Sequence, residues 1–324
     1  MQRAVSEEID VELGLKLYHQ MLQLRDFELK VQELYRTGIM PGFVHLYIGE
    51  ESVAVGVCAS LEKSDLIYST HRGHGHALAK GVPGREVMAE LFGKRTGCCG
   101  GRGGSMHMYA PEYGFMGTNG IVGGGIPLAT GAALSAQLRN SGQVAVSFFG
   151  DGAVNSGSFH ESMNFAALWN LPVVFACENN LYATEMAFRR ATKNTSIVSR
   201  ASAYGLDGVE VDATEVTDVY HAAKKAIDKA RSGGGPTLIE FKTYRFVGHH
   251  EGDPGTEYRT KEEVESWKQR DAIKKLREKL LSSDQADQAS IDRIHAETES
   301  WLEDAVQFAK SSPNPDPSTV LDHV

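Results

Sequence analysis

The sequence predicts an α/β protein with a parallel sheet, helices on both faces of that sheet, and further helices at the C-terminus. Apolar runs of strand length alternate with segments of helical pattern. The runs lie at residues 66–69, 144–149, 172–177, 209–212 and 237–243, and the helical segments at residues 126–140, 158–170 and 217–231. The runs are apolar throughout instead of alternating with polar residues, as expected when both faces of a strand are covered.

The ends of the chain read as helices added to this sheet. Residues 10–37 carry apolar side chains at helical spacing and are followed by Gly38, and residues 50–61 predict a second helix. A His- and Gly-rich turn is expected at residues 70–76. Thr260 and Glu263 form a capping box that opens a charged, amphipathic region. We therefore expect a main domain at residues 1–260 and a C-terminal helical extension with a tail at 261–324.

Composition limits the possible functions. The chain has 324 residues, a net charge of -9 and 23% charged residues, which is typical of a globular protein and not of a nucleic-acid binder. No apolar run approaches the roughly 18 residues of a membrane span. Its four cysteines form no CxxC pair, so a reduced, cytoplasmic location is expected.

Two polar motifs follow neighbouring predicted strands. Gly150-Asp151-Gly152 follows one strand, and Glu178-Asn179-Asn180 follows the next. One helix lies between them, and a capping box of Ser158 and Glu161 is expected to begin it. Adjacent parallel strands end at the same edge of a sheet, where open α/β sheets bind ligands. A carboxylate and an amide oxygen suit Mg²⁺, and the glycines allow backbone N–H groups to approach a phosphate. Either motif alone would be an ordinary turn, but the pair predicts a magnesium-bridged diphosphate.

These motifs carry a family resemblance. GDG, about thirty residues and then NN is the thiamine diphosphate fingerprint, and the chain resembles the α subunits of the pyruvate, branched-chain and acetoin dehydrogenase E1 components. The segments that carry this resemblance, in family order, are HLYIGEES, STHRGHGHALAKG, GGSMHMY, NGIVGGGIPLATG, GDGAVNSGSFHESMNFAALWNLPVVFACENNLYA and TYRFVGHHEGDPG. The similarity implies the thiamine diphosphate-binding fold and an oxidoreductase.

The resemblance also implies roles for single residues. Asp151 and Asn180 would bind Mg²⁺ through their side chains and Tyr182 through its carbonyl group. The amides of Gly152 and Ala153 would lie near the diphosphate.

Other positions would contact the rest of the cofactor or the substrate. Arg72 would pair with the diphosphate charge, and Gly120 and Val122 would lie against the aminopyrimidine. His249 would assist transfer to the lipoyl group, and His45 would face the substrate. The remaining cofactor-binding position, His71, departs from some pyruvate enzymes, which have tyrosine there.

The same resemblance implies partners. In the family, the glutamate that activates the pyrimidine ring belongs to a separate β subunit, and Glu50, Glu51 and Glu178 fit their own local motifs. We therefore expect half an active site, completed in an α2β2 assembly with an E1 β subunit. The assembly would pass an acetyl unit to a lipoyl-bearing E2 acyltransferase.

Several alternatives stay open. A nucleotide-dependent oxidoreductase lacks support because the sequence contains neither GxGxxG nor GxxxxGK[ST]. A non-catalytic assembly subunit is disfavoured by the set Asp151, Asn180 and His249. His71, His74 and His76 have the spacing of a metal cluster, and Cys98–Cys99 could be redox-active, although plain thiols are favoured.

The substrate is left between acetoin, pyruvate and branched-chain 2-oxo acids. The segment GHHEGDP resembles the GH-aromatic-EGD pattern of acetoin enzymes, whereas pyruvate enzymes tend to have serine after the histidine. Acetoin is therefore the favoured small-molecule substrate.

Overall fold

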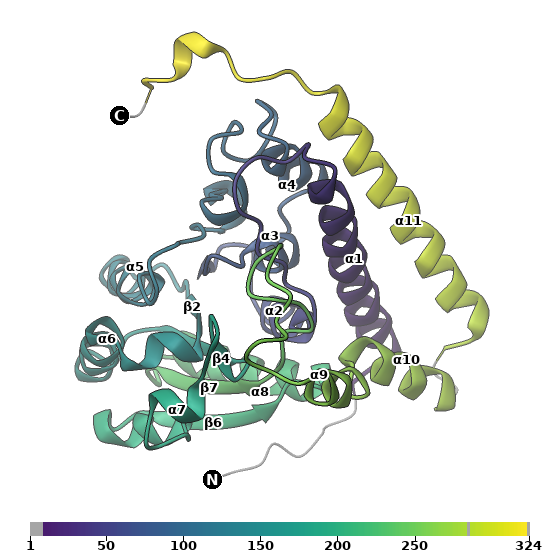
Figure 1. Ribbon diagram of the computed structural model, residues 1–324. Coiled ribbons are helices and arrows are strands. Elements are labelled where there is room, and N and C mark those ends of the chain that lie inside the picture. The colour runs from purple at the N-terminus through teal and green to yellow at the C-terminus, as the bar shows by residue number, and fades with distance from the viewer. Residues whose placement is uncertain (1–8, 284–285, 323–324) are drawn as a thin grey trace.

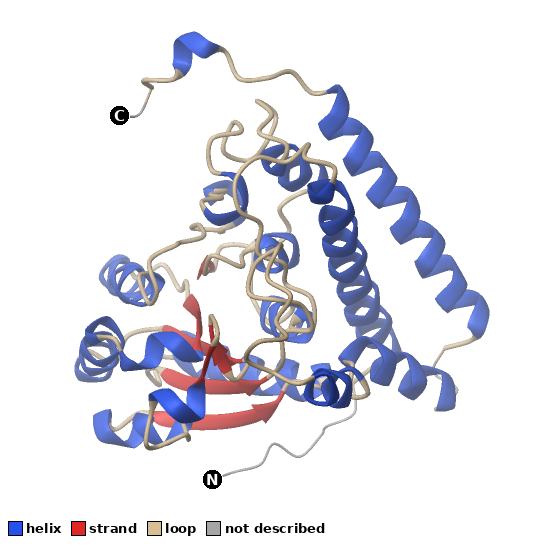
Figure 2. Ribbon diagram, viewed as in Figure 1, coloured by secondary structure: helices blue, strands red, loops and turns tan. Residues whose placement is uncertain are grey.

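The protein is built around a five-stranded, all-parallel sheet, as the sequence predicts. A computed structural model describes residues 9–283 and 286–322, and its sheet has the strand order β1-β2-β3-β7-β6 (Figures 1 and 2). The strands are β1 Leu66–Tyr68, β2 Ala145–Gly150, β3 Val173–Asn179, β6 Asp207–Asp212 and β7 Thr237–Lys242. A separate two-stranded antiparallel hairpin, β4 Tyr182–Ala183 with β5 Met186–Ala187, follows β3.

Both faces of the sheet are covered by helices. One face packs against α2 (Glu51–Cys58) and α8 (Val216–Arg231), and the other against α5 (Gly125–Arg139) and α6 (Gly157–Leu168). Successive side chains of β3 alternate between these two cores: Val174 and Ala176 lie in the first, Phe175 and Cys177 in the second. This two-sided burial explains why the strand is apolar at every position.

Helices from the two ends of the chain pack side by side. The long helices α1 (Val11–Arg36) and α11 (Gln288–Ser311) run next to each other, and α11 also packs on α4 (Gly84–Leu91) (Figure 1). Asp10 caps α1 by accepting a hydrogen bond from the Leu13 N–H at 2.7 Å. The remaining C-terminal helices are α9 (Lys261–Lys268) and α10 (Ala272–Ser282).

Four local expectations need correction. Strand β6 lies at the edge of the sheet and pairs with one strand, β7. Most of its residues are exposed, so its apolar run is not covered on both faces as expected. Helix α6 is capped by Ser156, which accepts from the Phe159 N–H, and not by Ser158. The expected turn at residues 70–76 is already helical from His74, where α3 (His74–Lys80) begins, and β3 extends to Asn179.

The remaining helical elements are short turns within the connecting loops. They are α7 Phe188–Ala191 and the 3₁₀ turns Gly104–Met106, Pro111–Tyr113, Asp151–Asn155, Val198–Tyr204 and Pro317–Thr319. Over the described parts of the chain, no helix is both long and apolar enough to cross a membrane.

Candidate active site at the carboxyl edge of the sheet

The two polar motifs converge at one edge of the sheet, as the sequence predicts. Strands β2 and β3 pair in parallel with Gly150 opposite Glu178, so Asp151 and Asn180 follow adjacent strand ends. The Asn180 backbone is close enough to the Asp151 carboxylate to lower the pKa of that group, against the larger effect of burial. Twenty-nine positions apart in the chain, the two residues are therefore held together by the register of the sheet.

Asp151 has the surroundings of a cation ligand. The residue is 1% exposed, and its Oδ2 atom has no hydrogen-bond partner. Burial raises the pKa of its carboxyl group to about 7. A buried carboxylate oxygen without a partner is energetically costly, and a bound metal ion would remove that cost.

A cavity opens at this edge and collects the predicted residues. Its volume is about 230 Å³. All of the site residues proposed from the sequence line it: His45, His71, Arg72, Gly120, Val122, Asp151, Gly152, Ala153, Asn180, Tyr182 and His249. They come from segments spread over more than 200 positions, so the fold brings together what the sequence separates.

Three histidines face one another in this cavity. The ring of His45 lies edge-on to those of His71 and His249, with centroids 4.8 and 5.1 Å apart. The Nδ1 of His45 and the Nε2 of His71 are buried without a hydrogen-bond partner. Burial, and next the Arg72 charge, lower the pKa of His45 and His249 to about 3 and that of His71 to about 2. All three imidazoles are therefore neutral at pH 7.

The metal cluster suggested by the spacing of His71, His74 and His76 does not form. The ring of His74 binds Glu28 at 3.0 Å and Ser105 at 2.8 Å, and His74 does not line the cavity. His76 binds the Ser69 hydroxyl at 2.8 Å and Glu178 at 3.0 Å. Both rings are therefore engaged with side chains other than His71.

A loop after β7 holds His249 in place, and sequence reasoning missed its supporting residues. Arg245 donates from a guanidinium N–H to the His249 Nδ1 at 3.0 Å. The Asp253 carboxylate accepts from the His249 backbone N–H and from the Tyr258 hydroxyl, both at 2.6 Å. Since arginine only donates, the neutral His249 ring carries its proton on Nε2. The sequence signal for these supports is that Arg245 and Asp253 lie equally far before and after His249 in the segment TYRFVGHHEGDPG.

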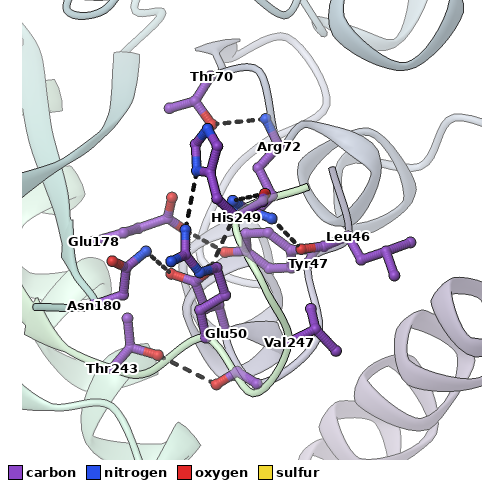
Figure 3. A network of polar contacts seen from close by, with 12 residues as sticks. Leu46, Tyr47, Glu50, Thr70, Arg72, Glu178, Asn180, Thr243, Val247 and His249 are labelled. Carbon is purple, nitrogen blue, oxygen red and sulfur yellow. Dashed lines mark hydrogen bonds and ion pairs between the residues drawn. The ribbon is translucent and has the colours of Figure 1, made fainter. Parts of the chain in front are cut away.

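Two glutamates also line the cavity, which the sequence assigned only to local motifs. Glu50 accepts from the Asn180 side-chain amide at 3.1 Å, and its other oxygen lies 3.7 Å from the Arg72 Nε (Figure 3). Burial, and next the neighbouring Glu178, raise the pKa of Glu50 to about 7. Glu178 accepts from the Tyr47 hydroxyl. Glu51 instead points away and binds Arg25.

Arg72 bridges two parts of the site. Its guanidinium donates to the Leu46 carbonyl at 2.5 Å and to the His249 carbonyl at 2.8 Å (Figure 3). The side chain is almost wholly buried, and burial lowers its pKa to about 10. In this structure Arg72 therefore fixes the loop of His249 while its charge stays beside the cavity.

Comparison with known proteins agrees with this geometry. Residues 19–318 match the family model of the dehydrogenase E1 component. The chain belongs to that family. It is 51% identical over 314 residues to the α subunit of an acetoin:2,6-dichlorophenolindophenol oxidoreductase from Bacillus subtilis (strain 168), covering 97% of this chain and 93% of the relative.

Two further relatives represent two named activities. The α subunit of the acetoin:2,6-dichlorophenolindophenol oxidoreductase from Cupriavidus necator is 45% identical over 98% of this chain and 95% of its own length. The chloroplastic pyruvate dehydrogenase E1 component subunit alpha-3 of Arabidopsis thaliana is 45% identical over 98% of this chain and 75% of its own length. This E1 chain is accordingly an oxidoreductase subunit of a thiamine diphosphate-dependent type.

The cavity fits such a cofactor. The backbone at Gly152 approaches the β4 hairpin so closely that a Cβ there would lie 2.7 Å from that of Ala183. Buried polar atoms without partners, on Asp151, Glu50 and Arg245, surround the same space. A diphosphate with a bound cation would offer negative charge to the arginine and positive charge to the carboxylates.

Proposed function

We propose that this E1 chain supplies the magnesium- and diphosphate-binding half of an active site that cleaves acetoin oxidatively. One observation carries the proposal: the unpartnered Asp151 carboxylate oxygen lies buried beside Asn180 at the carboxyl edge of a parallel sheet. Thiamine diphosphate, when bound, would supply a nucleophilic carbon that promotes cleavage of the substrate bond beside a carbonyl group.

The ligand set is proposed as follows. Asp151 and Asn180 bind Mg²⁺ through side-chain oxygens and Tyr182 through its carbonyl, which leaves positions for diphosphate and water. The backbone amides of Gly152 and Ala153 face the diphosphate. Support comes from the hard-oxygen chemistry of this set and from its burial, with Tyr182 5% exposed.

The other half of the site is proposed to come from a β subunit. Gly120 and Val122, which would contact the aminopyrimidine, line the open side of the cavity, and Val122 is 63% exposed. The cavity carboxylates Glu50 and Glu178 already bind Asn180 and Tyr47. An α2β2 assembly would cover this exposed wall and bring the missing glutamate, and it would exclude water from the reacting groups.

The histidines are proposed to handle substrate and acceptor. His45 and His71 offer neutral rings at the cavity wall, and His249 presents its Nε2–H, held by Arg245 and Asp253. Acetoin, an uncharged hydroxyketone, is the substrate that we propose for these side chains. The two acetoin oxidoreductase relatives support the same choice. We propose that His249 assists transfer of the two-carbon acyl unit to the lipoyl group of an E2 acyltransferase.

The substrate is tested by reconstituting the α chain with its β subunit, thiamine diphosphate, Mg²⁺ and an artificial electron acceptor. We expect acetoin to give the highest kcat/KM, with pyruvate and branched-chain 2-oxo acids lower. A higher kcat/KM for pyruvate would make the chain a pyruvate dehydrogenase E1 subunit and would overturn the choice of acetoin.

The half-site is tested in the same assay without the β subunit. We expect no turnover by the α chain alone, because Asp151 is assigned to the metal, and the other two described cavity carboxylates, Glu50 and Glu178, already bind Asn180 and Tyr47. Turnover by the α chain at the rate of the α/β mixture would show that the missing carboxylate lies in this chain.

A further inference from the structure

A glycine-rich loop at residues 97–104 is held rigidly by one buried carboxylate. Glu90, on α4, is fully buried. Its Oε2 accepts from the backbone N–H groups of Cys99 and Gly101 at 2.8 and 2.9 Å, and its Oε1 from those of Gly103 and Gly104 at 2.7 and 3.0 Å. Four charge-assisted bonds to one side chain fix the loop in a single conformation.

This loop presents two adjacent thiols. Cys98 and Cys99 are both partly exposed, whereas Cys58 and Cys177 are buried in the core. The two sulfur atoms and a Glu90 oxygen all lie within 4.8 Å of one another. Among the described residues, this is one of two such groups of metal-ligand side chains, and the other is the histidine group of the cavity.

The thiols also differ in reactivity. The Tyr109 backbone N–H donates to the Cys99 sulfur at 2.9 Å. A hydrogen bond from Cys98 holds the pKa of the Cys99 thiol below its usual value, and the same bond raises the pKa of Cys98. The thiolate is the reactive form of cysteine, so Cys99 is the thiol expected to react first, and Cys98 provides the second sulfur atom.

We propose that Cys98 and Cys99 form a bidentate binding site for trivalent arsenicals. With an arsenoxide, two As–S bonds form while the As=O and two S–H bonds break, and both thiol protons leave with the oxygen as water. Arsenic stays trivalent, so no oxidant is needed. A disulfide between adjacent residues would instead require a strained backbone. The fixed loop lowers the entropy lost on binding.

A ligand bound at this dithiol site would also affect cofactor binding. The Cys99 sulfur lies 3.6 Å from the His107 carbonyl oxygen, and a Cβ at Gly103 would lie 2.2 Å from that same oxygen. The His107 ring in turn faces Gly120, where a Cβ would lie 3.7 Å from the ring Nε2. This step rests on the proposed function, since Gly120 is assigned there to the aminopyrimidine. A modified loop should shift His107 and weaken cofactor binding.

The site is tested with phenylarsine oxide on the α/β enzyme, in the absence of E2 so that no lipoyl thiols are present. Intact-mass spectrometry of the α chain should show one phenylarsenic group bound with loss of two hydrogens. A 1,2-dithiol should remove it, and a monothiol at the same concentration should not. Cys98→Ala and Cys99→Ala should each lose the stable adduct, and the matched control Cys58→Ala should keep it.

The outcomes separate the site from its effect. No adduct, or an adduct that survives in Cys99→Ala, would overturn the dithiol site. The adduct should also raise the Kd for thiamine diphosphate severalfold by calorimetry, and not in Cys99→Ala treated in the same way. An adduct with unchanged cofactor affinity would refute the coupling through His107. Failure of the proposed function itself would instead appear as cofactor binding that does not depend on Asp151.

Discussion

Two groups of histidines in this protein have opposite surroundings. His74 and His76 are fully buried, and both nitrogens of each ring have partners, which are Glu28 and Ser105 for one and Ser69 and Glu178 for the other. His45 and His71 instead each keep a buried nitrogen without any partner, facing the cavity.

This difference distinguishes histidines that stabilise the fold from histidines that can bind a ligand. A buried ring with both nitrogens bonded stabilises the fold and has no capacity left for a ligand. A buried ring with an unpartnered nitrogen costs stability until a ligand binds it. His249 belongs with the second group, since Arg245 binds its Nδ1 and leaves Nε2 for the cavity. Both groups consist of histidines in buried or partly buried positions, so their partners distinguish them.

The largest effect is expected for His249→Ala. Transfer of the acyl unit to the lipoyl group should fall by about 10²–10⁴-fold, the usual contribution of a positioned acid–base group. The melting temperature should change little, because the ring makes one side-chain hydrogen bond. Stopped-flow measurement of lipoyl acylation, with a thermal melt as control, checks both. Loss of folding with retained acylation per folded molecule would place His249 in the group that stabilises the fold.

The opposite pattern is expected for His74→Ala. The free energy of unfolding should fall by about 1–3 kcal/mol or more, because Glu28 is left as a buried carboxylate without its partner. Activity per folded molecule should be retained, since His74 does not line the cavity. Urea denaturation and an active-site-normalised assay make the test. Unchanged stability with reduced turnover would erase the distinction between the two groups.

A smaller, graded effect is expected from pH. The folded-state pKa values of His45, His71 and His249 are lowered to about 3, 2 and 3, while unfolded histidine titrates near 6.5. Below pH 6.5 the unfolded chain therefore binds more protons, and stability falls as the pH drops from 6.5 toward 3. His71→Phe should show a shallower fall between pH 7 and pH 5. An equally steep fall in that variant would show that His71 does not contribute.

The sequence predicted the parts of the site that depend on strand ends. Asp151 and Asn180 could be placed together because parallel strands fix which ends are adjacent, and the pairing of Gly150 with Glu178 confirms it. Helices α1 and α8 were likewise found within a residue or two, because their apolar spacing is regular.

Parts that depend on side chains meeting across the fold were missed. The supports Arg245 and Asp253 act through a loop whose shape comes from side-chain hydrogen bonds, and no periodicity encodes those. Glu50 and Glu178 could not be placed in one cavity because 128 positions and several elements separate them. The cap of α6 shifted from Ser158 to Ser156 because both serines satisfy the same composition rule.

The central claim is that this E1 chain holds the metal and diphosphate end of the cofactor through Asp151. It is tested most directly by calorimetric titration of thiamine diphosphate with Mg²⁺ into the α/β enzyme, comparing wild type, Asp151→Ala and the exposed-surface control Asp207→Ala. Circular dichroism confirms that each variant is folded.

We expect Mg²⁺-dependent binding to be lost in Asp151→Ala and unchanged in Asp207→Ala, since Asp207 pairs only with Lys229 at the surface among the residues described. Folded Asp151→Ala that binds the cofactor with wild-type affinity in Mg²⁺ would contradict the assignment.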